Sequence, residues 1–176
     1  MQEATQVLVE EHEGIKRVLS LIERANEKVS LGKDLPPDFL PEMLDFIKTF
    51  ADTCHHGKEE GVLFPLFEKK GLPRENGPIG MMLVEHDLGR EQVKEASLAS
   101  DRGETRIALE HLEKYAQILK DHIEKENNIL YPMGNQLLAS DDHQYLQEEF
   151  AKVEEKVGQG KHEAYHRMIG RWEKTL

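Results

Sequence analysis

Residues 122–132, HIEKENNILYP, repeat a pattern that also occurs at residues 55–65, HHGKEEGVLFP. When the final prolines of the two stretches are aligned, both fit H-x-x-K-E-x-x-x-L-[FY]-P, in which a histidine precedes a glutamate by four residues. On a helix, residues four apart are neighbours on one face. The repeat therefore places an imidazole beside a carboxylate twice in one small chain.

The two pairs are His55 with Glu59 and His122 with Glu126. A neutral imidazole next to a carboxylate is a ligand pair suited to a borderline metal such as iron, manganese or zinc. Two such pairs indicate two metal ions. The doubled residues of the first copy leave its register open by one residue, because His56 and Glu60 have the same spacing.

The overall composition excludes several other classes of function. The chain has 176 residues, 38% hydrophobic and 32% charged, as in an ordinary globular domain. Its formal net charge of -11 argues against nucleic acid as a partner, because phosphate backbones favour lysine and arginine. No apolar run approaches the roughly 20 residues that cross a bilayer, and the N-terminus does not resemble a signal peptide. We therefore expect a cytoplasmic protein with no membrane partner.

Helical periodicity dominates the chain, and no stretch alternates like a half-buried strand. Helices are expected over about residues 2–31 and 38–70, then from about Pro78, and again after a loop near residues 100–103. Four long helices with short connections predict an all-α fold, an up-down-up-down antiparallel four-helix bundle.

We expect one domain over residues 1–176, with the four-helix core at about 2–138 and a helical extension at about 141–175. The apolar residues of the extension, such as Tyr145 and Trp172, are expected to pack against the bundle or against a second copy of the chain. A homodimer through this segment is thus a further prediction.

The apolar seams of the first and third helices also carry histidine. His12 is in step with Leu8 and Ile15, and His86 is in step with Met82. Four helices thus direct six candidate metal ligands into the core: His12, His55, Glu59, His86, His122 and Glu126.

Burial of two carboxylates requires compensation, because one unpaired buried charge costs several kcal/mol. A pair of metal ions provides it, and six side chains leave coordination positions open for water, oxo, dioxygen or nitric oxide. By helical phase, His55 and Glu59 face inward, whereas His56 and Glu60 lie nearer the edge.

The other histidines are weaker candidates. His162 and His166 are four apart but have no carboxylate in phase, which favours a solvated face, and His111 and His143 belong to no cluster.

Tyr115 is either a hydrogen-bond donor to the ligands or a core residue. Cys54, the single cysteine, is expected to be a packing residue and excludes thiolate zinc and iron–sulfur ligation within one chain.

These residues resemble the hemerythrin-like, or HHE cation-binding, family over about residues 5–135. The resemblance rests on four stretches in the order of that family's helices: EEH at residues 10–12, HHGKEE with LFP at 55–65, VEHD at 84–87, and HIEKENNILYP at 122–132. It implies a non-haem di-iron centre in a four-helix bundle, with Glu59 and Glu126 as bridging carboxylates.

The chain departs from the oxygen-carrying hemerythrins at Arg90, where those proteins have a fifth histidine, and this weighs against reversible oxygen carriage. Its set of four histidines and two glutamates is more similar to that of bacterial di-iron proteins of iron–sulfur cluster repair, although the cysteine pair of their N-terminal domain is absent here.

We therefore expect a di-iron protein that binds dioxygen or nitric oxide, or that senses or stores iron, with manganese or zinc less favoured. The alternatives are an oxidoreductase or repair factor, and a metal-free interaction bundle.

Overall fold

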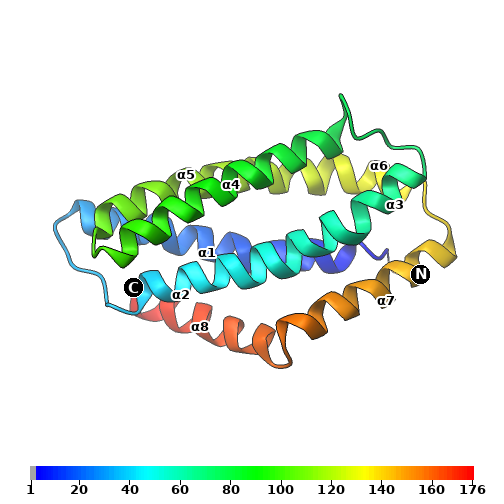
Figure 1. The fold of residues 1–176 in the computed structure, drawn as a ribbon. Coiled ribbons are helices and arrows are strands. Elements are labelled where there is room, and N and C mark those ends of the chain that lie inside the picture. The colour runs from blue at the N-terminus through cyan, green and yellow to red at the C-terminus, as the bar shows by residue number, and fades with distance from the viewer. Residues whose placement is uncertain (1–2) are drawn as a thin grey trace.

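The structure, a computed structural model, describes residues 3–176, and within this range the chain forms helices and turns but no strand. Long helical rods lie alongside one another, and a final pair of helices covers one side of them (Figure 1). The first and third rods are single helices, α1 (Gln6–Ser30) and α4 (Pro78–Asp101).

The second and fourth rods are composites of α-helical and π-helical segments. The second consists of α2 (Phe39–Phe46), η1 (Ile47–His56), η2 (Glu59–Leu63) and α3 (Phe64–Lys69). The fourth consists of α5 (Thr105–Lys125), η3 (Glu126–Leu130) and α6 (Tyr131–Asn135). The final pair is α7 (Ser140–Val157) and α8 (Lys161–Thr175). The expectation of an all-helical protein is confirmed.

The end of α1 follows from its sequence. Gly32 has φ 76°, a left-handed conformation that glycine adopts without steric cost. The backbone N–H of Gly32 donates to the carbonyl of Val29, and that of Lys33 donates to the carbonyl of Lys28. These bonds satisfy carbonyls that the last helical turn leaves unpaired, and they turn the chain towards α2.

Each copy of the repeated motif contains a π-helical segment between its glutamate and its proline. η2 begins at Glu59 and η3 at Glu126, and each ends just before the aromatic residue and the proline. A proline lacks the N–H that an α-helix needs in its interior, but it is tolerated in the first turn of a new segment. Pro65 and Pro132 occupy that first turn in α3 and α6. The chain therefore stays helical through Pro65 and Pro132.

The π-helical segments also shift the helical phase, because their hydrogen bonds span five residues instead of four. The spacing of three and four residues that includes His122 and Glu126 continues to Ile129 and Met133 and predicts both on the buried seam. They are instead 50% and 42% exposed. Leu130 and Tyr131 are buried in their place. That part of the predicted seam was wrong because it assumed an uninterrupted α-helix.

The core consists of two apolar clusters separated by a polar layer. One cluster contains Ile15, Ala51 and Leu119, and the other contains Leu8 and Leu63. The boundary between the clusters falls at the inward histidines and glutamates on every rod. Apolar clusters therefore flank the polar layer on both sides along the bundle.

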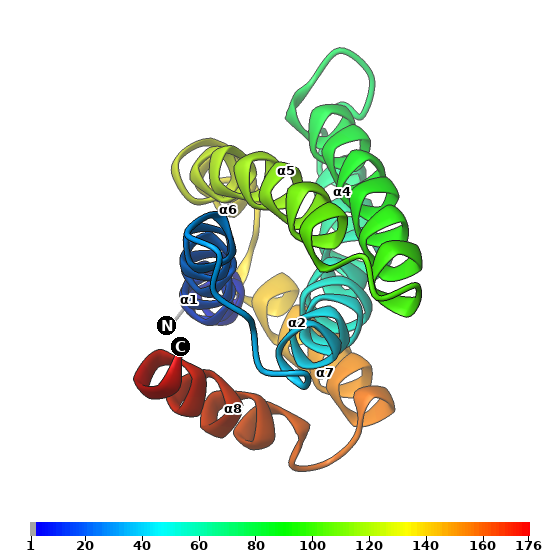
Figure 2. The same cartoon turned by 90° about the vertical axis from the view of Figure 1, so that its left-hand side faces the viewer.

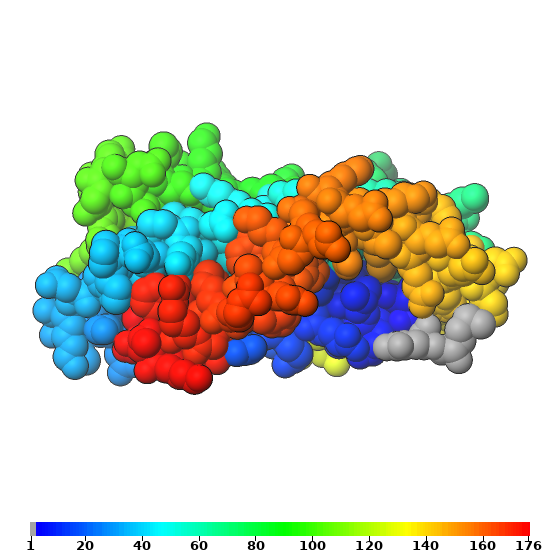
Figure 3. Space-filling view, turned by 90° about the horizontal axis from the view of Figure 1, so that it is seen from below, coloured from blue at the N-terminus to red at the C-terminus, as the bar shows by residue number. Residues whose placement is uncertain are grey.

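The C-terminal helices pack against the chain's own bundle. Helix α7 lies along η1 and η2, and α8 lies along α1 (Figure 2). Figure 3 shows this pair from the outside, running across the face formed by α1 and the second rod. Tyr165, Ile169 and Trp172 are buried there, and the indole N–H of Trp172 donates to Glu42 at 2.5 Å. Tyr145 is 48% exposed, and a homodimer through this segment stays a prediction.

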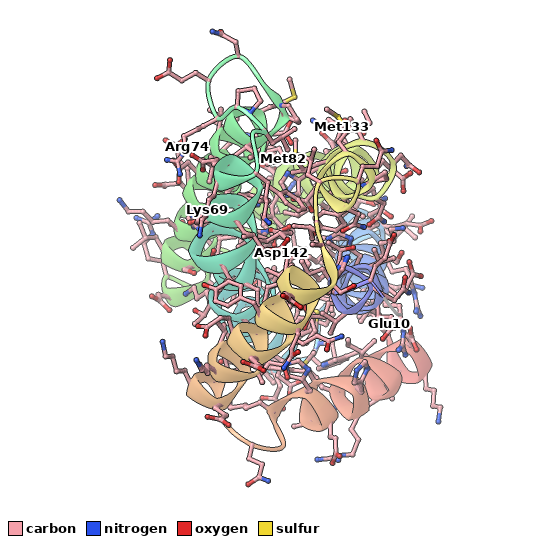
Figure 4. The ribbon with its side chains drawn as sticks, turned by 90° about the vertical axis from the view of Figure 1, so that its right-hand side faces the viewer. Glu10, Lys69, Arg74, Met82, Met133 and Asp142 are labelled. Carbon is pink, nitrogen blue, oxygen red and sulfur yellow. The ribbon has the colours of Figure 1, made fainter. Side chains whose placement is uncertain are left out.

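Near the start of α7 the chain is fixed to the second rod. Figure 4 looks at this end, with Asp142 at the beginning of α7. The Asp142 carboxylate lies 2.5 Å from the ammonium of Lys70. No helix among residues 3–176 is long and apolar enough to cross a membrane.

Gly134 has no room for a side chain, because a Cβ there would lie 2.1 Å from the ring of Phe67. Since Phe67 and Gly134 both stand two residues after the motif proline, the two copies of the motif meet here.

Gly134→Ala is expected to lower the free energy of unfolding by about 1–3 kcal/mol. Gly14→Ala is the control: a Cβ there has nothing within 4 Å, and we expect it to stabilise α1 by about 0.5–1 kcal/mol. Urea unfolding measures both, and equal effects would contradict the packing argument.

Candidate metal centre

All six predicted ligand residues meet in the polar layer. The histidines come from α1, η1, α4 and α5, and the glutamates from the first positions of η2 and η3. Each of the six is at most 2% exposed. The inward orientation expected from helical phase is therefore found at His12, His55, Glu59, His86, His122 and Glu126.

One end of the layer is formed by His12, His55 and Glu126. Nε2 of His12 lies 2.9 Å from Nε2 of His55 and 3.2 Å from Oε2 of Glu126. Ligand atoms of these three residues all lie within 4.8 Å of one another.

The other end is formed by His86 and His122, whose Nε2 atoms are 3.1 Å apart. Oε2 of Glu59 lies 3.3 Å from Nε2 of His86, and Oε1 of Glu126 lies 3.1 Å from Nε2 of His122. Glu126 therefore contacts both ends, one through each oxygen. Oε2 of Glu59 contacts His86 and lies 3.9 Å from Nε2 of His55.

The outer nitrogen of each of these histidines is held by an oxygen. Nδ1 of His55 lies 2.9 Å from Glu11, and Nδ1 of His122 lies 2.9 Å from Glu85. Nδ1 of His86 lies 2.7 Å from Glu60. Sequence reasoning missed Glu11 and Glu85, although each directly precedes a seam histidine, because the histidine that each holds belongs to a neighbouring helix. Nδ1 of His12 lies 2.8 Å from Oδ1 of Asn127, so an oxygen holds the outer nitrogen of all four histidines.

The lysine of the repeated motif binds the same carboxylate as the histidine of its own copy. The ammonium of Lys58 lies 2.5 Å from Glu11, which holds His55. In the second copy, Lys125 pairs with Glu85, which holds His122. The lysine thus neutralises the glutamate that orients the histidine, and this explains its place in the pattern.

Tyr131 is the tyrosine at the centre. Its hydroxyl donates to Oε1 of Glu59 at 2.5 Å and lies 3.4 Å from Oε2 of Glu126. Tyr115, for which the sequence left open a hydrogen-bond donor or a core residue, is a buried core residue and lines a cavity. The aromatic position of the motif was the available signal for Tyr131, but the other copy has Phe64 there, which has no hydroxyl.

The structure places the four residues of the first copy whose register was left open. His55 and Glu59 face the centre, whereas Glu60 is half-buried and holds His86. His56 was expected near the edge, but it is 4% exposed and its ring stacks on that of His86 at 3.8 Å between centroids. The prediction for His56 was wrong because it lies in π-helical η1, where two consecutive side chains reach the interior.

The histidines outside the centre make separate contacts. His162 is half-buried, with Nε2 3.5 Å from the Cys54 sulfur, so the prediction of a solvated face was wrong for it. His166 is exposed, Nδ1 of His111 bonds to Gln92, and Nδ1 of His143 accepts the N–H of Ala4 at 3.2 Å. Cys54 is fully buried, and burial raises the pKa of its thiol to about 11.

The charges of the centre stabilise one another in the metal-free protein. Burial alone would lower the pKa of His122, but Glu126 and Glu85 raise it to about 10. Burial likewise opposes the charged form of His86, and the adjacent carboxylates of Glu59 and Glu60 raise its pKa to about 9. Burial raises the pKa of Glu126, but the histidines beside it hold that pKa well below its ordinary value.

The inner nitrogens show that these residues fit a metal cation. Where Nδ1 bonds to an anionic carboxylate it carries the ring hydrogen, so Nε2 of the neutral ring presents a lone pair. Two inner nitrogens face each other at 2.9 Å between His12 and His55, and at 3.1 Å between His86 and His122. Ligands at right angles on one ion, with bonds of about 2.1 Å, would be roughly 3 Å apart.

The carboxylates fit a cation as well. Oε2 of Glu59 and Oε1 of Glu126 are buried and make no hydrogen bond. A buried carboxylate oxygen without a donor is costly, and a metal ion supplies what it lacks. Each glutamate thus has one oxygen without a hydrogen-bond partner, and this agrees with the facing imidazoles.

A comparison with protein families also indicates metal binding. The model of the hemerythrin HHE cation-binding domain matches residues 3–134. The chain belongs to the hemerythrin HHE family. Membership implies a bound metal cation, typically iron, and the His/Glu groups of this hemerythrin-like chain fit such a site.

Among curated proteins, this hemerythrin-like chain is similar to the iron-sulfur cluster repair protein YtfE of Edwardsiella ictaluri (strain 93-146). The two are 33% identical over 122 residues, covering 65% of this chain and 55% of that protein. The chain therefore spans about half the length of this relative.

A cavity of about 310 Å³ leads to one end of the centre. Its inner lining includes His56, His86 and His122, and its walls include the apolar side chains of Val93 and Leu119. A small molecule entering here would reach the end held by His86 and His122 before the end held by the other pair of histidines.

The metal-free protein is expected to lose stability as the pH rises from about 7 to 10. The pKa values of His86 and His122 are raised in the folded state to about 9 and about 10, above the ordinary 6.5. Their stabilisation is therefore complete below pH 6.5 and disappears as the pH passes through those values. Urea unfolding of chelator-treated protein at pH 6.5 and pH 10 should differ by more than about 1.4 kcal/mol, which corresponds to one pKa unit at one group. A flat profile would contradict this charge pairing.

Proposed function

We propose that this hemerythrin-like chain is a non-haem di-iron protein. His12 and His55 would hold one iron, His86 and His122 the other, and Glu59 and Glu126 would bridge the two. The observation that carries the proposal is the pair of facing imidazoles at each end, with Glu126 in contact with both ends.

Binding of dioxygen or nitric oxide, or sensing or storage of iron, is the function that this donor set supports best. When bound, the iron pair supplies open coordination positions and redox chemistry for such ligands. The protein's own residues orient the ligands: Glu11, Glu85 and Glu60 fix three of the imidazole rings, and Tyr131 donates a hydrogen bond to Glu59. A histidine-rich site favours binding and sensing over oxygenase chemistry.

An oxidoreductase or an iron–sulfur cluster repair factor acting at the same centre is the alternative. Its support is the similarity to a protein named for cluster repair, although nearly half of that relative lies outside the match. The four long rods and their short connections support the finer description as an up-down-up-down antiparallel four-helix bundle. A single domain over residues 1–176 and a cytoplasmic location are further parts of the proposal.

Metal content per chain tests the proposal first. Protein made in iron-replete medium should contain about two irons by mass spectrometry, and His122→Ala/Glu126→Ala should lose them. His111→Ala/Glu110→Ala changes the same residue types on α5 away from the centre and should keep both irons. Wild-type protein that stays metal-free after anaerobic reconstitution with ferrous iron would refute the di-iron function.

Gas binding then separates the two functions. Iron-loaded protein titrated with nitric oxide should bind it in fixed proportion to iron and release it unchanged. Catalytic consumption of nitric oxide or peroxide would favour the enzyme, and restoration of a damaged iron–sulfur protein would favour the repair factor. Stoichiometric binding without turnover would exclude the enzymatic alternative.

A further inference from the structure

The cavity that leads to the centre is much larger than a diatomic gas requires. Its volume of about 310 Å³ compares with the roughly 30 Å³ that one water molecule occupies in the liquid. Pockets that bind organic ligands in other proteins begin at about 300 Å³. The cavity therefore has room for an organic molecule of about ten non-hydrogen atoms.

This cavity extends from the surface of the protein to the buried histidines. On α4 its lining runs from His86 to Lys94 and beyond, and these two residues are about 12 Å apart along an α-helix. Lys94 and Lys48 are exposed, whereas His86 and His122 at the inner end are at most 2% exposed. An occupant would therefore have one end at the solvent and the other end beside the centre.

Between these two ends the walls of the cavity are mainly apolar. Ile47 lines it from the second rod, Val93 from α4 and Leu119 from α5. All three side chains are buried. An alkyl or aryl body fits such walls, because the transfer of apolar surface from water to an apolar environment is favourable.

The charges of the lining favour an anion at the open end. Asp52 forms an ion pair with Arg90, and Glu85 forms one with a lysine of the fourth rod. Lys48 and Lys94 also line the cavity, and neither forms an ion pair with any of residues 3–176. The uncompensated charges of the lining are thus both positive, in a chain whose formal net charge is -11.

Ser97 adds a hydrogen-bond donor next to Lys94. A serine inside a helix commonly donates to the carbonyl one turn back or points to solvent. Oγ of Ser97 is instead buried without a hydrogen-bond partner, and the residue lines the cavity. Since residues three apart lie on one face of a helix, Ser97 and Lys94 are neighbours. A carboxylate accepts hydrogen bonds from a hydroxyl and from an ammonium, so it would supply the partner that Ser97 lacks.

We propose that the cavity binds a monocarboxylic acid with an apolar body, of the medium-chain fatty acid type. The carboxylate lies between Lys48 and Lys94 and accepts a hydrogen bond from Ser97. The apolar body extends past Val93 towards His86. This inference goes beyond the di-iron function and does not depend on it, because none of these contacts involves a metal ion.

Isothermal titration calorimetry with straight-chain alkanoates tests the size and the charge of the site. Iron-loaded protein should bind about one decanoate per chain, and from hexanoate to decanoate the affinity should rise about fourfold with each buried methylene. Acetate, which lacks the apolar body, and 1-decanol, which lacks the charge, should bind at least about tenfold more weakly than decanoate. Chelator-treated protein should bind decanoate with the same affinity as iron-loaded protein.

Two variants locate the site within the cavity. Lys48→Gln/Lys94→Gln changes only exposed side chains and should weaken decanoate binding roughly tenfold. Val93→Phe places a larger side chain in the cavity and should abolish binding. The control, Lys33→Gln/Lys114→Gln, removes two exposed lysines that do not line the cavity and should leave the affinity unchanged.

The results that would overturn the proposal are distinct from those that would refute the di-iron function. Equal affinity of the wild type and Lys48→Gln/Lys94→Gln for decanoate would overturn it, as would an affinity that does not rise with chain length. Binding that disappears when iron is removed would show that the carboxylate binds the metal ions, and would overturn it too. A chain that binds decanoate but no iron would refute the di-iron function and leave this proposal intact.

Discussion

Anaerobic loading with ferrous iron is expected to raise the free energy of unfolding by at least about 4 kcal/mol, once free iron exceeds its dissociation constant a thousandfold. Metal ions bind the folded centre, where ligands from four rods converge, and the unfolded chain does not bring these ligands together. Glu59 and Glu126 carry the negative charge that the ions require. Glu59→Gln/Glu126→Gln should therefore abolish the iron-dependent stabilisation.

Denaturant titrations with and without iron measure this effect. Glu110→Gln/Glu155→Gln, which changes two exposed glutamates, should retain the full iron-dependent gain. If the double variant of the centre gained as much stability from iron as the wild type, the buried glutamates would not be ligands. Iron binding elsewhere on the acidic surface would then be the explanation.

Lys58→Met is expected to destabilise the metal-free protein by about 3–5 kcal/mol, far more than the same change at Lys125. The side chain of Lys58 is fully buried, and its ammonium lies 2.5 Å from both Glu11 and Glu154. Its removal leaves the buried Glu11 without its cation, and an uncompensated buried charge costs this amount.

Lys125 is the matched control, because it stands at the same position of the other motif copy and pairs with Glu85. Its side chain is 30% exposed, so water compensates for its loss and we expect an effect of about 1 kcal/mol or less. Urea unfolding of both chelator-treated variants gives the comparison. Equal losses would show that burial does not govern the strength of these pairs.

Lys58→Met should also weaken metal binding, because Glu11 orients His55. Loss of such an outer partner typically costs 10–100-fold in metal affinity. The affinity of the variant for cobalt can be measured by competition with a chelator at constant pH. This readout separates the orienting role of Lys58 from its effect on folding.

The amino-acid sequence by itself determined the helical class and the inward face of each rod. Alternating steps of three and four residues placed His12, His86 and His122 on buried seams, because helical periodicity is a local property of the chain. The repeated motif placed Glu59 and Glu126 in equivalent positions for the same reason. In the α-helical parts of the rods, helical phase alone was sufficient to predict which side chains face the core.

Only the tertiary structure decided which side chains hold these residues in place. Glu11 reaches His55 and Glu85 reaches His122 across helices, and such contacts depend on how far each rod is shifted along its neighbour. The hydroxyl of Tyr131 and the buried ring of His56 depend on π-helical segments that change the phase by a fraction of a turn. Local spacing carries no information about either effect, because both result from the packing of whole helices against one another.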